Sequence, residues 1–279
     1  MLASHLNSAF PDLHPSLLLG MIFSVVLLRY LVFAGGALLI LMAFRSQISH
    51  HRLQAQPISM RQLAHEAGFS MLSFIIFGLV GFAVHRANEA LGFIQLYRSI
   101  DGTLGWLWFA LSIPLALLVH DFYFYWMHRF IHLPGVYGLV HSVHHKSTNP
   151  TPLAAFSFHP LEAVLEVLGF VVMMSVVPMH PVAFLIVSTV MIVMNVTGHL
   201  GYELFPASWQ HHPVMKFANT STSHNQHHRT YRYNYGLYTL IWDRLFGTLH
   251  PKYERTFKAA SRPKSARSKP SIPLKHPEI

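Results

Sequence analysis

The sequence predicts an all-α integral membrane protein with about four to five transmembrane or re-entrant helices. Hydrophobic residues make up 52% of the 279 residues and charged residues only 11%, whereas a soluble domain carries about 25% charged residues. Mean hydropathy is +0.36. Several apolar segments have the length of membrane-spanning helices, and histidines recur at helical spacing in three short motifs. The chain has no cysteine, which excludes disulfides, iron–sulfur clusters and thiolate metal sites within it.

Five apolar segments are candidates for these helices. The first, Leu17–Phe44, contains Arg29 as its only charged residue and is long enough to cross a bilayer. It is too long for a signal peptide, and no basic region precedes it. The remaining segments are Phe69–Val84, Thr103–Val119, Leu161–Val177 and Val182–Val196. Pro178 and Pro181 separate the last two, which predicts a helical hairpin whose arms either span the bilayer or re-enter it.

The positive charges predict the orientation of these helices. Arg45, Arg52 and Arg61 lie between the first two segments, whereas residues 1–16 contain no Lys or Arg. The positive-inside rule then places the N-terminus outside and residues 45–65 in the cytoplasm. Five crossings would place residues 120–160 and 199–279 in the cytoplasm as well, so that all three histidine motifs share one compartment.

Residues 255–279 are predicted to form a basic, disordered tail. Eight Lys or Arg and two Glu occur between residues 251 and 279, and the Ser/Pro/Lys/Arg composition from about Ala259 onward is typical of disorder. Anionic lipid is the simplest partner for this charge. No aromatic-rich basic domain accompanies it, so a nucleic-acid partner is not indicated.

Eight histidines in three motifs predict a metal centre. His128 and His132 are four residues apart and lie on one face of a helix. The other two motifs repeat an i, i+3, i+4 spacing: His141, His144 and His145, then His224, His227 and His228. Neutral imidazole is the commonest protein ligand for a transition metal, and burying so many unpaired imidazoles would be costly. The motifs are therefore expected to converge from separate helices on bound metal.

The number of imidazoles exceeds one coordination sphere, so two metal ions are expected. Imidazole suits iron, copper, nickel and zinc, whereas a structural zinc uses four ligands that are often thiolates. An all-histidine site leaves most of the metal charge uncompensated, which favours a ferrous pair with a reactive oxidised state. Such a pair would use O2 and outside electrons to take hydrogen from an unactivated C–H bond.

The motifs resemble those of the sterol desaturase/fatty acid hydroxylase superfamily. The first motif is Asp121–His132, the second is His141–Pro152, and the third is His224–His228 followed by Asn234–Gly236 and Trp242–Thr248. The segment Phe156–Glu162 is similar to the C-5 sterol desaturase branch. The resemblance covers about Leu104–Glu254, which indicates a catalytic domain over residues 104–254 after an N-terminal transmembrane region over residues 1–103.

The resemblance implies a non-haem di-iron membrane oxidoreductase that hydroxylates or desaturates a sterol-like or fatty-acyl lipid. Its members have transmembrane helices beneath a cytosolic helical cap that holds the metals, here two Fe2+ ions with O2 as co-substrate. Matching the motifs residue by residue implies that His199 joins the eight motif histidines as a ligand. Glu203 stands where some relatives have a second histidine and is a candidate ligand or hydrogen-bond acceptor. His120, just before the motif aspartate, is a further candidate ligand.

Carboxylates are expected to fix the imidazole tautomers by accepting the second ring N–H. The candidates are Asp121, Glu162, Glu203 and Asp243. Alternatively, Asp121 caps or pairs locally, for example with Arg129. His159, which precedes Pro160, could cap the following helix or reach the site, and the capping role is favoured. Because the chain has no flavin or haem-attachment motif, electrons are expected from a separate carrier, such as a cytochrome b5-like protein or a ferredoxin.

Three other classes of function remain alternatives. A histidine-lined transporter of divalent metal would place polar residues inside several spans, yet most of these spans are nearly devoid of them. A membrane scaffold with an inactive site would not need complete motifs. A metal hydrolase would use a His-Glu-x2-His motif, which the chain lacks. Hydroxylation and desaturation begin with the same hydrogen abstraction, and no motif distinguishes them.

Overall fold

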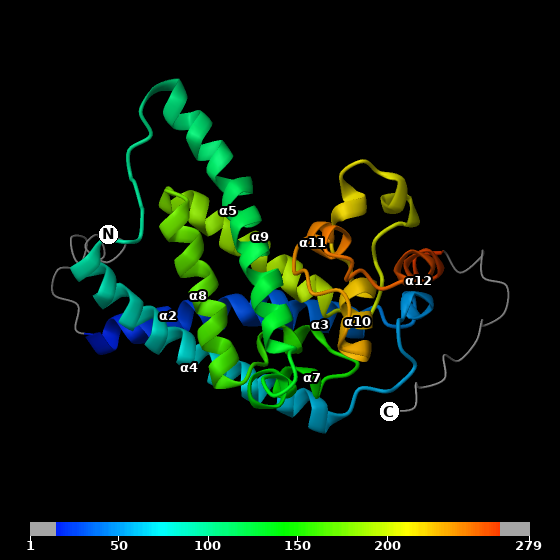
Figure 1. Cartoon of the computed structure of the whole chain (residues 1–279). Coiled ribbons are helices and arrows are strands. Elements are labelled where there is room, and N and C mark those ends of the chain that lie inside the picture. The colour runs from blue at the N-terminus through cyan, green and yellow to red at the C-terminus, as the bar shows by residue number, and fades with distance from the viewer. Residues whose placement is uncertain (1–14, 263–279) are drawn as a thin grey trace.

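The computed structural model describes residues 15–262 (Figure 1). The regular secondary structure in this range is helical, with isolated bridges but no strand. The long helices are α2 (Pro15–Tyr30), α3 (Gly36–Ala43), α4 (Met60–Leu91), α5 (Gly102–Ile131), α8 (Pro160–Val176) and α9 (Pro181–Gly198). The short ones are α6 (Tyr137–Val140), α7 (Ser142–His145), α10 (Ser221–Thr230), α11 (Ile241–Leu245) and α12 (Tyr253–Ala260). The predicted all-α fold is confirmed.

Four helical segments are long and apolar enough to cross a membrane. They are Ser16–Ala43, Met60–Leu91, Gly102–Ile131 and Pro181–Gly198. The first joins α2 to α3 through a π-helical turn at Leu31–Gly35. Its one charged residue, Arg29, donates to the hydroxyls of Ser188 and Thr189 in α9 at 3.2 and 3.3 Å. These hydroxyls give the half-buried guanidinium hydrogen-bond partners within an otherwise apolar segment.

The second and third helices are longer than the apolar segments that predict them. Helix α4 begins at Met60 because the Ser59 hydroxyl accepts from the backbone N–H of Gln62 at 3.1 Å, which is an N-cap. Helix α5 continues beyond its apolar part as far as Ile131 and so carries the first histidine motif. Apolar runs mark only the lipid-facing part of a helix, so hydropathy did not predict the polar extensions of α4 and α5.

The hairpin of α8 and α9 has the predicted turn. The turn lies against the α4–α5 connection, since Tyr97 donates its backbone N–H to Met179 O at 3.1 Å and Met179 donates to Gln95 O at 2.9 Å. Helix α8 has only 17 residues, whereas α9 is one of the four candidate spans. The His159 ring accepts from the backbone N–H of Leu161 at 3.3 Å, which confirms its predicted capping role.

Two apolar clusters hold the long helices together. One gathers residues of α5, α8 and α9, including Ala116, Phe124, Met173 and Val187. The other joins α2, α4 and α9 around Tyr30 and Phe74, whose ring centroids are 5.1 Å apart. Small and aromatic residues at these contacts let the helices approach closely, as expected inside a bilayer.

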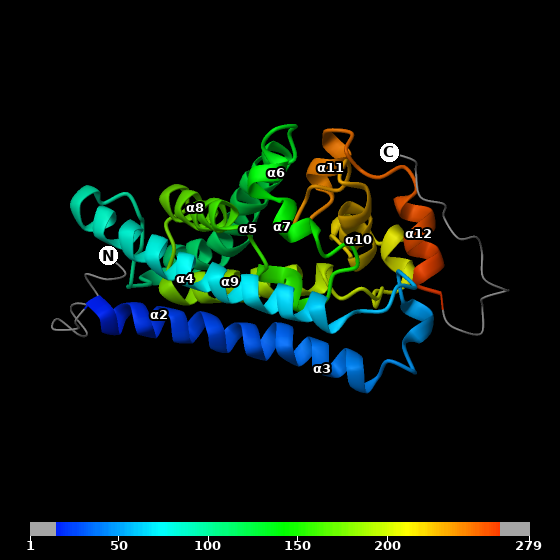
Figure 2. The same ribbon diagram turned by 90° about the horizontal axis from the view of Figure 1, so that it is seen from below.

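The remaining short elements form a cap at one end of the helices (Figure 2). We define the cap as residues 132–159 and 199–262. In both views residues 199–262 lie on the right, away from the start of α2, and residues 132–159 lie nearer the middle of the molecule. The carboxyl end of α5, the carboxyl end of α9 and helices α7 and α10 meet where the cap joins the long helices.

The prediction of a disordered tail from residue 255 is wrong for residues 255–260. These residues belong to α12, and Phe257 packs with Tyr253 and Leu240 in a small buried cluster. Two aromatic residues four positions apart give this helix an apolar face, which a composition averaged over the basic segment conceals. The rest of the predicted tail, residues 263–279, lies outside the described residues.

Candidate metal centre

Nine histidines lie in two groups whose side-chain nitrogens could each hold a metal ion. The five-histidine group is His128, His132, His141, His145 and His227, and the four-histidine group is His144, His199, His224 and His228. Within each group the candidate ligand atoms all lie within 4.8 Å of one another. All nine were predicted as ligands from the sequence, and the structure brings every one of them into a group.

Adjacent histidines in the second and third motifs point into different groups. His144 and His145 are neighbours in α7, and His227 and His228 are neighbours in α10. Successive residues of a helix differ by about 100° in direction, because a turn takes about 3.6 residues. A His-His pair can therefore serve two neighbouring centres. In this way α7 and α10 each contribute to both groups.

Three further histidines come from helix ends. His128 lies in the last turn of α5 and His132 follows it as the C-cap. His199 is the C-cap of α9, one position beyond its last residue. Three motifs and one helix end, which are up to 100 residues apart in sequence, are thus fixed relative to each other by the packing of four helices.

Backbone carbonyls set the tautomers of three of these rings. His128 Nδ1 donates to Tyr235 O at 2.8 Å, and His227 Nδ1 donates to Tyr233 O at 2.7 Å. His199 Nδ1 donates to Asn195 O at 2.8 Å. A carbonyl can only accept, so the proton lies on Nδ1 and the other nitrogen, Nε2, keeps its lone pair.

The Nε2 lone pairs converge in a manner that fits a cation and not a hydrogen-bond network. His227 Nε2 lies 3.1 Å from His132 Nε2 and 3.1 Å from His145 Nε2. One lone pair cannot accept two such N–H groups well. Two imidazoles bound to one ion at about 2.1 Å and at right angles would place their nitrogens about 3.0 Å apart. The five-histidine group has this spacing.

The four-histidine group repeats the pattern. His199 Nε2, whose lone pair is free of a proton, lies 2.9 Å from His224 Nε2 and 3.3 Å from His144 Nε2. His228 Nε2 lies 3.1 Å from His224 Nε2. The donor set of each group therefore fits one metal ion.

Burial keeps the rings neutral. Desolvation, followed by the proximity of the other rings, lowers the pKa of His144, His145 and His224 well below the usual value near 6.5. The same causes lower the pKa of His228. Neutral imidazole offers a lone pair at neutral pH, as metal coordination requires.

Of the four carboxylates predicted to accept a ring N–H, Glu162 lies against an imidazole. His141 Nδ1 and Glu162 Oε1 are 2.7 Å apart, and both side chains are buried. Asp243 acts one step further away, because it accepts the backbone N–H groups of Tyr235 and Gly236 at 2.8 and 2.9 Å. It thereby holds the loop whose Tyr235 carbonyl fixes His128.

The other two carboxylates, Asp121 and Glu203, do not have the predicted role. Asp121 contacts no imidazole, and it accepts from the Tyr238 backbone, the Thr239 hydroxyl and the Trp242 indole at 2.9, 2.6 and 3.0 Å. These bonds attach residues 238–242 to α5. The alternative pairing with Arg129 is also wrong, since the guanidinium lies 5.5 Å from the centre of the Trp126 ring and donates to the Tyr125 hydroxyl.

Glu203 and His120, the two further candidate ligands, lie outside both groups. Glu203 accepts from the backbone N–H of Thr222 at 2.9 Å and of Phe205 at 3.0 Å, which anchors the start of α10. His120 Nδ1 pairs with the Tyr238 hydroxyl at 2.9 Å, and its ring packs against Gly169 of α8. Carboxylates near the histidine motifs thus mainly fasten the loops and helices that carry ligands.

The carbonyls of Tyr233, Tyr235 and Asn195 were missed by sequence reasoning, because every residue has a carbonyl and none is marked as an acceptor. The one available signal was the Asn234–Gly236 motif. A Cβ at Gly236 would lie 2.2 Å from the backbone oxygen of Thr239, and Asn234 has a left-handed backbone with φ of 59°. The motif therefore permits a tight turn that delivers two carbonyls to the five-histidine group.

Known families and proteins match the same part of the chain. The fatty acid hydroxylase family matches residues 113–248, a range that includes all nine histidines. The Delta(7)-sterol 5(6)-desaturase of Eremothecium gossypii is 34% identical over 161 residues, which cover 57% of this chain and 44% of the relative. The lathosterol oxidase of Mus musculus is 34% identical over 165 residues, covering 58% and 54%.

A longer match joins the N-terminal helices to this region. The Delta(7)-sterol 5(6)-desaturase of Leptosphaeria maculans is 28% identical over 230 residues, covering 82% of this chain and 60% of the relative. The matched part amounts to about half the length of the curated relatives. No solved structure matches the chain.

Proposed function

Through residues 113–248 the chain belongs to the sterol desaturase/fatty acid hydroxylase superfamily, in its C-5 sterol desaturase branch, and we propose that it is an O2-dependent, non-haem di-iron oxidoreductase. The chain is an integral membrane protein, and we propose that it hydroxylates or desaturates a C–H position of a sterol-like or fatty-acyl lipid. The observation that carries the proposal is the pair of buried histidine groups with inward-facing Nε2 atoms.

Iron suits these groups better than structural zinc. The five-histidine group offers more ligands than the four of a tetrahedral structural zinc site, and neither group contains a thiolate. When bound, the iron would supply the activation of O2 and the abstraction of hydrogen from an unactivated C–H bond. Hydroxylation consumes O2, two electrons and two protons and yields one water, whereas desaturation yields two waters.

The protein's own residues hold the site in this proposal. The backbone carbonyls of Tyr233, Tyr235 and Asn195 keep the protons on Nδ1 and aim Nε2 inward. Glu162 does the same for His141. Tyr231 packs edge to face against His145, with ring centroids 4.7 Å apart, and so helps to hold this ring in place.

The lipid assignment is supported by where the site lies and by what the relatives are called. The histidine groups are at the ends of α5 and α9, two of the candidate membrane spans. A lipid with its polar group at the interface would place its apolar body beside these helices. The relatives are named as sterol desaturases and a lathosterol oxidase, which favours a sterol-like substrate. The proposed compartment for the cap is the cytoplasm, from the charge distribution.

A combined metal and product measurement tests the proposal. The protein, purified in lipid nanodiscs and loaded with Fe2+, should hold two irons and consume O2 only when a reductant is present. Lipids from cells with and without the gene should differ by one oxygen for a hydroxylase or by two hydrogens for a desaturase. Protein that binds no iron, or consumes no O2 with reductant and extracted lipid, would refute the proposal.

Single histidine variants separate metal binding from folding. His144→Ala and His227→Ala should lower bound iron and abolish turnover, while the protein still inserts into membranes. His211→Ala is the matched control, because His211 is an exposed cap residue outside both groups. Full activity in either of the first two variants would contradict the ligand assignment.

A further inference from the structure

We propose that the outer surface of the cap around α12 is the docking site of an acidic one-electron carrier protein. This inference rests on the proposed function, which requires electrons from outside the histidine groups. The surface, called the α12 face here, consists of the exposed cations Lys216, Arg244, Lys252, Arg255 and Lys258.

The charge of this part of the cap is one-sided. Between residues 204 and 262, all of which the structure describes, Glu254 is the only exposed acidic residue. It pairs with Arg244 at 3.3 Å. Cations are exposed throughout the same range: Lys216, Arg229, Arg232, Arg244, Lys252, Arg255, Lys258 and Arg262. A surface of one sign raises the association rate of a partner of the opposite sign.

The basic residues of α12 lie opposite its buried face. Tyr253, Phe257 and Ala260 are buried against the cap, whereas Arg255 and Lys258 are exposed. A helix that binds a lipid surface needs an exposed apolar face to insert, and this helix has already buried its apolar face. A soluble acidic protein is therefore the favoured partner.

The α12 face is close to the histidines. Gln226 of α10 donates to the Thr256 hydroxyl of α12 at 3.1 Å. The Tyr253 hydroxyl lies 3.3 Å from the Thr220 hydroxyl, and Thr220 O accepts the backbone N–H of His224 at 3.1 Å. Packed helix axes are about 8–10 Å apart, so α12 is one helix away from three of the nine histidines. Electron transfer weakens steeply with distance, which makes a short separation a requirement.

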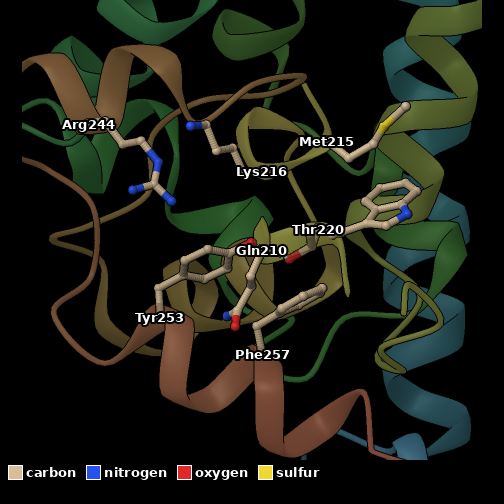
Figure 3. Close-up of a pocket in the computed structure, with 8 residues that line it drawn as sticks. Gln210, Met215, Lys216, Thr220, Arg244, Tyr253 and Phe257 are labelled. Atoms are coloured by element: carbon tan, nitrogen blue, oxygen red, sulfur yellow. Dashed lines mark hydrogen bonds between the residues drawn. The ribbon is translucent and has the colours of Figure 1, made fainter. Parts of the chain in front are cut away.

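A small pocket lies between α12 and the rest of the cap, on the side of α12 that faces inward. Figure 3 shows Tyr253 and Phe257 rising from α12 beneath Lys216 and Arg244, which extend from two other segments of the cap. Trp209 and Met215 complete its apolar lining. Lys216 and Arg244, which lie above this pocket, are exposed, so they add to the positive charge that an acidic carrier would meet.

A double charge reversal tests the proposal. Arg255→Glu/Lys258→Glu should weaken binding of the acidic haem domain of a b5-type cytochrome to the nanodisc-embedded protein by about tenfold or more. It should also flatten the dependence of binding on salt. The matched control is Arg45→Glu/Arg61→Glu, which changes charge equally at exposed positions outside the cap. Each docked haem domain gives up one electron and is oxidised as the metal site is reduced, so its reoxidation rate is a second measurement.

The outcomes separate this inference from the proposed function. Turnover driven by dithionite should be unchanged in the double variant, because that reductant needs no docking. If wild type shows no such turnover, the proposed function fails. If it does, and the haem domain binds both double variants equally well, the docking site is refuted. A binding loss that occurs only in nanodiscs containing anionic lipid would assign the face to lipid and overturn the proposal.

Discussion

Replacing Glu162 should weaken metal binding in one histidine group and leave the other intact. Its carboxylate lies 2.7 Å from His141 Nδ1, and the two side chains are only 1% and 2% exposed. His141 belongs to the five-histidine group. A hydrogen bond to a charged group contributes about 1.5–3 kcal/mol, which corresponds to about 10- to 150-fold in affinity. Losses of 10- to 100-fold are typical when the outer partner of a metal-bound histidine is removed.

Iron titration of the nanodisc-embedded protein measures this effect. Glu162→Gln keeps an oxygen acceptor but removes the charge, so it should lose less affinity than Glu162→Ala. In either variant bound iron should fall from two toward one per chain at limiting iron, because the four-histidine group has no contact with Glu162. The control is Glu166→Gln, which makes the same substitution one helical turn away at a carboxyl outside both histidine groups. Equal loss from both groups, or unchanged affinity in Glu162→Ala, would refute the assigned role.

Three further predictions follow from neighbouring contacts. His145→Ala should release the ion of the five-histidine group, and His144→Ala should release the ion of the four-histidine group. Metal analysis, with spectroscopy of the remaining ion, distinguishes the two variants. An identical loss in both variants would contradict the two-group arrangement. Gly236→Ala should destabilise the protein by about 1–3 kcal/mol, because the added Cβ would meet Thr239 O at 2.2 Å. The control Gly138→Ala should not destabilise it, since a Cβ there meets nothing within 4 Å. Equal melting temperatures of the two variants would count against the turn. Burial lowers the pKa of His144 and His224 well below 6.5, so these rings stay neutral in the folded chain but bind protons when it unfolds. The stability of the metal-free protein is therefore complete above about pH 6.5 and lost as the pH falls, and thermal unfolding that is independent of pH between 8 and 5 would contradict this.

Spacing predicted eight of the nine histidines, because it is itself the geometry of the site, whereas His199 was predicted only from the resemblance to the family. A separation of four residues on a helix puts two rings on one face, and a His-His pair directs two rings to different sides. The four candidate spans were likewise visible as apolar runs, since a bilayer requires them. These features depend on local periodicity, which a single sequence records.

Contacts between segments that are distant in the sequence were not predicted correctly. Asp121 lies seven residues before His128, which suggested a shared role, yet it accepts from Tyr238, Thr239 and Trp242. Glu203 matched the position of a ligand in some relatives, yet it holds the start of α10. A carboxylate has the same appearance in the sequence whether it meets an imidazole or a backbone N–H. Which of these it meets is decided by how the loops return to the helices.

Helix α12 shows that the average composition of a segment can also mislead a prediction. Residues 255–260 were grouped with a basic tail because Lys and Arg dominate this region. The spacing of Tyr253 and Phe257 determines the structure instead, since it places both rings in one buried cluster. A few well-spaced apolar residues can outweigh the average composition of a segment.

The most direct test of the central claim is a structure of the iron-loaded protein in nanodiscs that locates the metals by anomalous scattering or by their density. We predict two separate ions. One is bound by Nε2 atoms of the five-histidine group and the other by Nε2 atoms of the four-histidine group, with metal–nitrogen distances of about 2.0–2.2 Å. A single ion, or ions bound elsewhere while the nine rings stay metal-free, would contradict it.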